Sequence, residues 1–176
     1  MRPVTQRLSA AGFSPWVVLN QYGPNADVGL AVKLSSNGNL TYSVKYTYDP
    51  LIAATLKSSL TRVTTSLTVP ITNHGLSVDD SVVIQGFGTP FDGDFAVASV
   101  TDQDNVVVTV ANSGATGIAS NLGVVFTARV FTHPVLAALT ASADSNFDKP
   151  ISACRLIITS YTAGYADLTV RQGSLQ

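Results

Sequence analysis

The residues of this chain that could bind a metal ion are two histidines and a group of aspartates in the middle of the sequence. These aspartates are Asp79, Asp80, Asp92 and Asp94. They flank two turn signals, and their carboxylate oxygens would suit Ca²⁺ if the turns converged. Their spacing lacks the regular Asp-x-Asp-x-Asp-Gly loop of a dedicated calcium site. We therefore interpret them as solvated turn carboxylates, and we expect no metal and no cofactor.

The two histidines lie far apart in the sequence and lack partners at metal-ligand spacing. His74 precedes Gly75 within a turn signal, and His133 precedes Pro134. We predict that His74 bonds its own turn and that His133 packs at the end of a strand. Neither histidine is expected to act as a ligand or as a base.

No segment matches a catalytic motif. Residues 86–90, Gly-Phe-Gly-Thr-Pro, are rich in glycine but lack a Lys-Ser or Lys-Thr pair and a following helix, so we interpret them as a turn. No serine lies in a Gly-x-Ser-x-Gly setting, and the chain contains no glutamate. Cys154 is expected to pack as a small apolar residue, because the side chain of Arg155 would point to the opposite face of a strand. We predict that the chain is not an enzyme.

Five aromatic residues invite a carbohydrate-binding hypothesis, because flat rings stack on sugar rings. They are Trp16, Tyr22, Tyr42, Tyr46 and Tyr48. The last three would share one face of a strand, and aromatics gathered on one sheet more often form a core. We favour a core or a subunit interface over a sugar site.

The composition favours a protein that works in an assembly. Hydrophobic residues make up 45% of the 176 residues, which is ample for a core, and charged residues make up only 12%. That is roughly half of the usual ~25%, and a net charge of −1 leaves little repulsion between copies. Basic residues are scattered, no ~20-residue apolar run occurs, and the first residues lack the apolar segment of a secretory signal. We expect neither nucleic acid nor membrane as a partner.

Alternation of apolar and polar residues predicts strands at both ends of the sequence. Residues 40–48 alternate strictly and end at Asp-Pro, and residues 28–34 precede them across an Asn-Gly turn, so we predict a hairpin. Residues 153–161 and 166–172 are expected to be two further strands joined by a turn at Gly164.

The middle of the chain, about 63–128, shows short strands between closely spaced turns. Such spacing is typical of a sandwich or a barrel. Residues 51–60 have a short helical pattern, and residues 135–143 are interpreted as a loop. We predict an all-β protein, a β-sandwich of jelly-roll or immunoglobulin-like type with a small β-module inserted in a loop.

The predicted organisation has three parts. Residues 14–60 and 129–173 form a discontinuous outer sandwich, residues 61–128 form the inserted module, and residues 1–13 form an N-terminal arm. An insertion of this kind is tolerated where the two ends of a loop lie close together. The alternative is one continuous sandwich of about ten strands.

Motifs at both ends of the chain resemble those of small virion proteins of tailed bacteriophages. They are Pro-Trp at 15–16, the Tyr-x-Val-x-x-Thr-x-Asp strand at 42–49, Ala-x-Arg-Leu at 153–156, and Thr-Val-x-Gln at 169–172. Residues 131–134 and 144–146 also fit that pattern. The resemblance implies a β-sandwich virion protein, and these motifs consist of turn and core residues rather than catalytic ones.

The middle segment resembles a module of phage fibre and decoration proteins. Its pattern is His-Gly-Leu-x-x-Gly-Asp-x-Val-x-Ile, then Gly and Phe-x-Gly-x-Phe-x-Val, here at 74–84, 86 and 91–97. Asp79 replaces the glycine of the pattern, so the turn before that strand is expected to be built differently.

The resemblance and the composition together predict a structural protein of the virion. We expect a decoration (cement) protein that binds the major capsid protein or other virion proteins on the outside of the head and stabilises it. The alternative is a tail, collar or fibre component with host-surface or glycan binding. We expect a homo-oligomer, and a trimer is the commonest arrangement in similar phage proteins.

Overall fold

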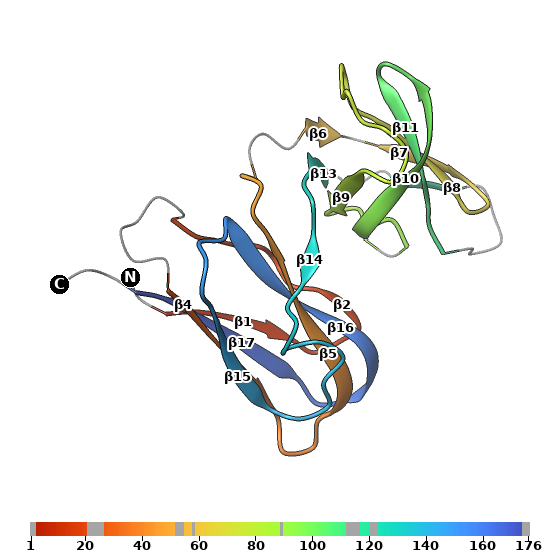
Figure 1. Cartoon of the computed structure of the whole chain (residues 1–176). Helices are drawn as coiled ribbons and strands as arrows, with labels where there is room; N and C mark the ends of the chain where they lie inside the picture. Colours follow the sequence, from red (N-terminus) through yellow and green to blue (C-terminus); the bar gives the residue numbers. More distant parts are fainter. Residues whose placement is uncertain are drawn as a thin grey trace. The chain divides into compact units, whose positions relative to one another are not determined.

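The computed structural model is all-β, which confirms the predicted fold class (Figure 1). It describes residues 3–20, 27–51, 55–57, 59–88, 90–111, 117–119 and 123–173. The chain divides into two compact units: unit 1 consists of Met1–Pro50 with Val130–Gln176, and unit 2 of Leu51–Arg129. None of the described residues forms a helix long and apolar enough to cross a membrane.

Unit 1 contains two antiparallel sheets. One has the order β1-β17-β4-β15, and the other has the order β14-β5-β16-β2 with β3 paired to β16 (Figure 1). Their bounds are β1 Val4–Leu8, β2 Gly12–Phe13, β3 Val17–Val18, β4 Val28–Leu34, β5 Asn39–Thr47, β14 Phe131–Thr132, β15 Ala143–Phe147, β16 Ala153–Ala163 and β17 Ala166–Gln172. Residues 1–13, expected as an arm, therefore include two strands of these sheets.

The predicted hairpin between residues 28–34 and 40–48 is wrong. β4 pairs with β17 and β15, whereas β5 pairs with β16 and β14, so the Asn-Gly turn carries the chain from one sheet to the other. Both strands have a strongly apolar face, and placing them in opposite sheets lets the two faces bury each other. A hairpin would have placed both strands in the same sheet and left their apolar faces without an opposite layer to bury them.

The turn between β16 and β17 also carries the chain from one sheet to the other, and it packs against the turn between β4 and β5. The backbone N–H of Ser35 donates to the carbonyl of Tyr165 at 3.0 Å, and the N–H of Tyr165 donates to Ser35 Oγ at 3.0 Å. Gly164 has a φ of 88° at this contact. A Cβ there would lie 2.6 Å from the Cα of Gly38, so two turns distant in sequence require a glycine where they meet.

The core of unit 1 forms from the inward faces of both sheets. The predicted inward residues of β17, namely Ala166, Leu168 and Val170, are all buried, as are Tyr42 and Val44 of β5. Other members of the same cluster are Val28, Leu30, Val32, Leu136, Phe147, Cys154, Leu156 and Ile158.

The eight strands of unit 2 follow one continuous path, β12-β7-β8-β11-β10-β9-β13-β6. Their bounds are β6 Thr55–Lys57, β7 Leu60–Val63, β8 Ser66–Pro70, β9 Ser81–Gln85, β10 Gly93–Asp102, β11 Asn105–Thr109, β12 Gly117–Ala119 and β13 Gly123–Thr127. The first half of β10 pairs with β9 and the second half with β11, with two register shifts in the second half. One strand thus joins two halves of a sheet that enclose a separate apolar core.

The predicted helical pattern at 51–60 is wrong for the described part of that segment. Residues 55–57 pair with β13, and Leu60 begins β7 and is buried in the core of unit 2. Both belong to unit 2, so the first boundary lies at 50/51 rather than near 60. Residues 55–57 and Leu60 pair with strands from distant parts of the sequence, which a local pattern does not reveal.

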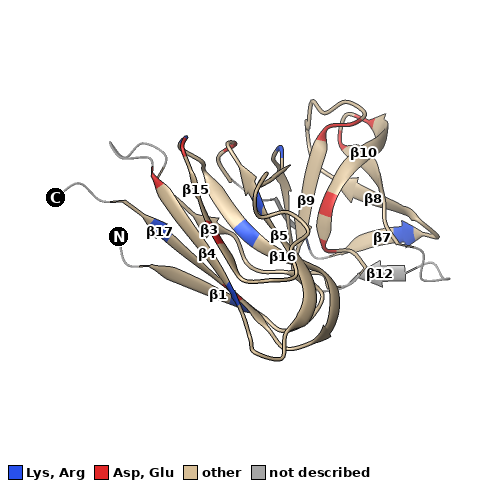
Figure 2. Ribbon diagram, turned by 60° about the horizontal axis from the view of Figure 1, so that its bottom comes forward, with Lys and Arg blue, Asp and Glu red and all other residues tan. Residues whose placement is uncertain are grey.

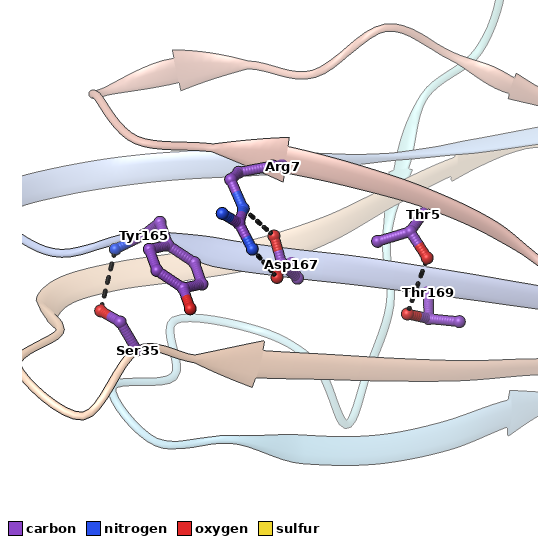
Figure 3. A network of polar contacts seen from close by, with 6 residues as sticks. All are labelled: Thr5, Arg7, Ser35, Tyr165, Asp167 and Thr169. Carbon is purple, nitrogen blue, oxygen red and sulfur yellow. Dashed lines mark hydrogen bonds and ion pairs between the residues drawn. The ribbon is translucent and has the colours of Figure 1, made fainter.

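Strand β1 is held at the edge of its sheet by side chains on the outer face (Figure 3). Arg7 donates two hydrogen bonds of 2.7 Å to the carboxylate of Asp167, and its guanidinium lies 3.8 Å from the ring centre of Tyr165. Thr5 and Thr169 form a second cross-strand pair, with hydroxyl oxygens 3.3 Å apart. The hydrogen bond from Arg7 lowers the pKa of Asp167 and outweighs the opposite effect of burial.

Gly164→Ala tests the contact between the two turns. We expect it to reduce the free energy of unfolding by more than ~1 kcal/mol, because alanine resists a positive φ and its Cβ meets backbone. Urea unfolding followed by circular dichroism measures the loss. Gly29→Ala is the matched control, since its Cβ would meet only Arg171 O at 3.8 Å, and equal losses in both variants would contradict the expectation.

Asp167→Asn tests the ion pair on β1. The folded-state pKa of Asp167 is lowered, so its carboxylate stabilises the fold at neutral pH, and this contribution is lost as the pH falls through that pKa. We expect the variant to melt at a lower temperature than the wild type at pH 7, and the difference to shrink as the pH falls below the ordinary pKa of an aspartate and through the lowered one. Asp144→Asn, on β15 of the same sheet, is the control. A difference that persists in acid would refute this account.

Candidate functional site

The four aspartates considered as metal ligands lie in unit 2, where at least two of them hold backbone groups. Asp80 accepts the N–H of Ser77 at 2.7 Å, and Asp92 accepts the N–H of Phe87 at 2.8 Å. Asp79 has a φ of 73°, the conformation that the glycine of the related pattern would adopt readily, and Asp94 lies in β10. Within the described residues, no three acidic, histidine or cysteine side chains gather into a group that could hold a metal ion.

Both histidines engage neighbouring backbone. The Nδ1 of His74 accepts the N–H of Leu76 at 2.8 Å, and its Nε2 lies 2.9 Å from the carbonyl of Asp102. The Nδ1 of His133 accepts from the N–H groups of Val135 and Leu136, and its Nε2 lies 3.3 Å from the carbonyl of Asn146. Because Nδ1 is the acceptor in each ring, the proton of the neutral imidazole belongs on Nε2 in both cases.

The glycine-rich segment 86–90 forms a turn in its described part, and Thr89 lies outside the described residues. Gly86 and Gly88 have φ values of 97° and 81°, and the N–H of Phe91 donates to the carbonyl of Gly88 at 2.8 Å. No helix follows, since Gly93 begins β10.

Cys154 and Arg155 face opposite sides of β16, as a strand requires. Cys154 belongs to the core of unit 1, and burial raises the pKa of its thiol to about 12. Arg155 is only 1% exposed, with its guanidinium 4.2 Å from the ring centre of Phe13 and 4.5 Å from that of Trp16. The role of Trp16 is therefore to cover a buried cation by cation–π contact, a role that the sequence pattern did not suggest.

The remaining aromatic candidates divide between core and surface. Tyr42 is fully buried, and its hydroxyl donates to the carbonyl of Ala141 at 2.8 Å. Tyr46 and Tyr48 lie at the other end of β5 and just beyond it, where they meet rings from distant segments. Tyr22 lies outside the described residues.

These rings form an aromatic cluster, which we define as Tyr46, Tyr48, Phe131, His133 and Phe147. Tyr46 is at its centre, with ring centroids 5.4 Å from Tyr48, 5.6 Å from Phe131 and 4.8 Å from Phe147. Strand pairing produces this arrangement, because Phe131 of β14 lies directly opposite Tyr46 of β5. His133 packs edge-on against Phe147 at 4.7 Å.

A pocket of about 330 Å³ opens beside the cluster, and we call it the aromatic pocket. It is lined by Tyr46, Tyr48, His133, Pro134, Val135, Ser145, Asn146, Phe147, Asp148 and Lys149. Burial, and then the neighbouring Tyr48, raise the pKa of Tyr46, so its hydroxyl keeps its proton at neutral pH. The pocket therefore combines aromatic rings with hydrogen-bonding side chains, and it can bind a ligand that has both an apolar and a polar side.

Charged residues are few and scattered over the strands and turns that the structure describes (Figure 2). Asp148 and Lys149 are adjacent and of opposite sign at the rim. Sequence analysis identified Tyr46 and Tyr48 but missed Phe131 and Phe147. No local signal could have found them, because only the pairing of β14 and β15 with other strands brings them to β5.

No family model matches the sequence, and no curated protein matches it. Among solved structures, the chain is similar to an endosialidase of phage phi92, with 20% sequence identity and a TM-score of 0.40. The similarity covers 67% of this chain and 22% of the endosialidase chain. A similarity of this degree supports no conclusion about function.

The burial of Cys154 predicts an inert thiol. We expect the folded protein to resist alkylation by iodoacetamide at about pH 8, since the thiolate fraction is very small there and the sulfur is covered. Protein unfolded in urea should react at the rate of an ordinary cysteine. Mass spectrometry of both samples over time measures the difference, and rapid labelling of the folded protein would contradict the buried position.

Proposed function

We propose that this chain is a non-enzymatic structural protein of a bacteriophage particle, which binds the outside of the head shell as a decoration protein. The motifs at both ends of the chain, which resemble those of small virion proteins, support the class of protein. The low charge and the exposed apolar side chains of the surface support binding to the head shell. The observation that carries the proposal is a charge-poor surface that leaves large apolar side chains exposed.

Those apolar side chains occur on both units. In unit 1 they are Val18, Tyr48, Phe131, Val135 and Tyr161, and in unit 2 they are Val63, Val78 and Val100. Full burial of one large apolar side chain against a partner contributes about 1.5–3 kcal/mol. With charged residues at 12% of the chain, little electrostatic repulsion opposes such contacts. Surfaces of this kind suit a protein that is covered by neighbours in an assembly.

Main-chain groups provide a second means of attachment. In the four-stranded sheet of unit 1, β1 and β15 are the end strands of the described order and pair on one side only. An end strand can accept a strand from another chain, which adds backbone hydrogen bonds without requiring charge. We propose that unit 1 makes the shell contacts, that unit 2 stays free of them, and that the protein acts as a homo-oligomer, with a trimer as the expected form.

Binding to shells that lack the protein tests this function. Purified chain is mixed with head shells prepared without it from the phage that encodes it, and co-sedimentation measures binding at micromolar concentration. We expect saturable binding of the wild type. No binding of a folded sample would overturn the proposal.

Matched variants test which unit makes the contact. Val18→Asp places a charge at a position of unit 1 that is 65% exposed, and Val78→Asp does the same at a position of unit 2 that is 55% exposed. We expect the first variant alone to lose affinity, by about tenfold or more. Equal losses would contradict attachment through unit 1.

A second candidate function is that of a tail, collar or fibre component which contacts the host surface. The observation that favours it is the aromatic pocket, since a head-surface brace needs no ligand site. Labelling of intact particles with an antibody to the chain, viewed by electron microscopy, separates the two. Label on the head supports decoration, and label confined to the tail supports the second candidate.

A further inference from the structure

Two large rings of the aromatic cluster lie at the surface of unit 1; Tyr48 lines the aromatic pocket, and Phe131 packs beside Tyr48. Tyr48 and Phe131 are each 41% exposed, and their ring centroids lie 5.8 Å apart with planes inclined by 60°. Both rings contact Tyr46, which packs in turn on buried Phe147. Packing on Tyr46 therefore holds the exposed rings in place, so the binding of a ligand costs little side-chain entropy.

Polar side chains also line the pocket. They are Ser145, Asn146, Asp148 and Lys149, which together supply a hydroxyl, an amide, a carboxylate and an ammonium group. The amide nitrogen of Asn146 donates to Asp148 Oδ1 at 3.0 Å, which links two of these groups in one arrangement. The rim thus offers donors and acceptors, while the adjacent charges of Asp148 and Lys149 cancel.

His133 belongs to the wall of the pocket and not to its hydrogen-bonding rim. Its Nδ1 already accepts two backbone N–H groups, and the ring is 2% exposed against Phe147. The residue positions the aromatic wall. A metal or acid–base role for this pocket has no support, because the remaining titratable side chains of its lining are the two tyrosines, Asp148 and Lys149.

We propose that the aromatic pocket binds one neutral pyranose ring of a carbohydrate. A pyranose has an apolar face of C–H groups, which stacks on aromatic rings, and an edge of hydroxyl groups that both donate and accept hydrogen bonds. The pocket provides these two surfaces side by side, with no net charge at the rim. Its volume of about 330 Å³ lies at the low end of the ~300–1,000 Å³ usual for small-molecule sites, which suits a single ring.

A proline-rich peptide is the competing ligand, because such peptides also dock on exposed aromatic rings. Peptides of this kind lie along extended grooves and depend mainly on apolar contact. The aromatic pocket has a volume of only about 330 Å³, and besides its tyrosines and His133 it is lined by four polar side chains. These features favour the sugar.

Binding of the full chain to a panel of neutral oligosaccharides tests the proposal. The panel contains glucose, galactose, mannose and N-acetylglucosamine units, with decaproline as the peptide probe. Saturation-transfer NMR detects binding, and calorimetry measures affinity. We expect at least one oligosaccharide to bind and decaproline not to compete. Absence of binding by every oligosaccharide, or displacement by decaproline, would overturn the proposal.

Substitutions locate the site. Tyr48→Leu and Phe131→Leu keep apolar volume but remove the flat ring, so we expect each to weaken sugar binding at least ~10-fold while circular dichroism remains unchanged. Tyr161→Phe is the control, because Tyr161 is 37% exposed on β16 and belongs neither to the pocket lining nor to the aromatic cluster, whereas Phe131 contacts Tyr46 and Tyr48. Binding that survives both leucine substitutions would refute this location. Asp148→Asn and Lys149→Gln extend the test to the rim, where we expect weaker binding without loss of folding.

The proposal of a sugar site and the proposal of attachment to head shells can be disproved independently of each other. The rim variants Asp148→Asn and Lys149→Gln can be mixed with shells in the co-sedimentation assay, and Val18→Asp can be titrated with sugar. We expect the first pair to keep shell binding and the second variant to keep sugar binding. Loss of sugar binding in Val18→Asp, with its fold intact, would contradict a site confined to the aromatic pocket.

Discussion

The structure of unit 1 depends on how its strands are distributed between two sheets. β4 and β5 are neighbours in the sequence but lie in opposite sheets, and so do β16 and β17. β4 then pairs with β17 and β5 with β16, over seven residue pairs in the first case. Each strand presents its apolar face to the strand that precedes or follows it in the chain, and the core forms between them.

Contact between the β4–β5 turn and the β16–β17 turn specifies this distribution of strands between the two sheets. One backbone hydrogen bond and one to the Ser35 hydroxyl join Ser35 and Tyr165, which are distant in the sequence, and Gly164 allows the close approach. The ion pair of Arg7 with Asp167 adds an end strand to the same sheet. Exposed ion pairs contribute little by themselves, so the apolar core and the backbone pairing carry most of the stability, in keeping with a chain that has few charges.

The aromatic pocket is a consequence of the same pairing. Tyr46 lies opposite Cys154 of β16 on one side and opposite Phe131 of β14 on the other. The buried sulfur and the exposed rings therefore share one region of the sheet, and a rigid core supports a surface of rings. The lining residues Tyr46 and Phe147 lie in paired strands, and strands hold the geometry of side chains better than loops do.

The sequence by itself determined the all-β class, the inward face of β17 and the turn positions, because alternation and turn chemistry act between near neighbours in the chain. It did not predict that Ser43 and Thr47, on the polar face of β5, are buried. The tertiary structure alone decided which strands pair, that residues 55–57 join a sheet instead of a helix, and that Phe131 and Phe147 meet Tyr46. Pairing partners are selected by contacts between distant segments, whose gain must exceed the entropy lost in closing long loops. A period of two residues specifies a strand and its inward face, but the same pattern fits many partners equally well.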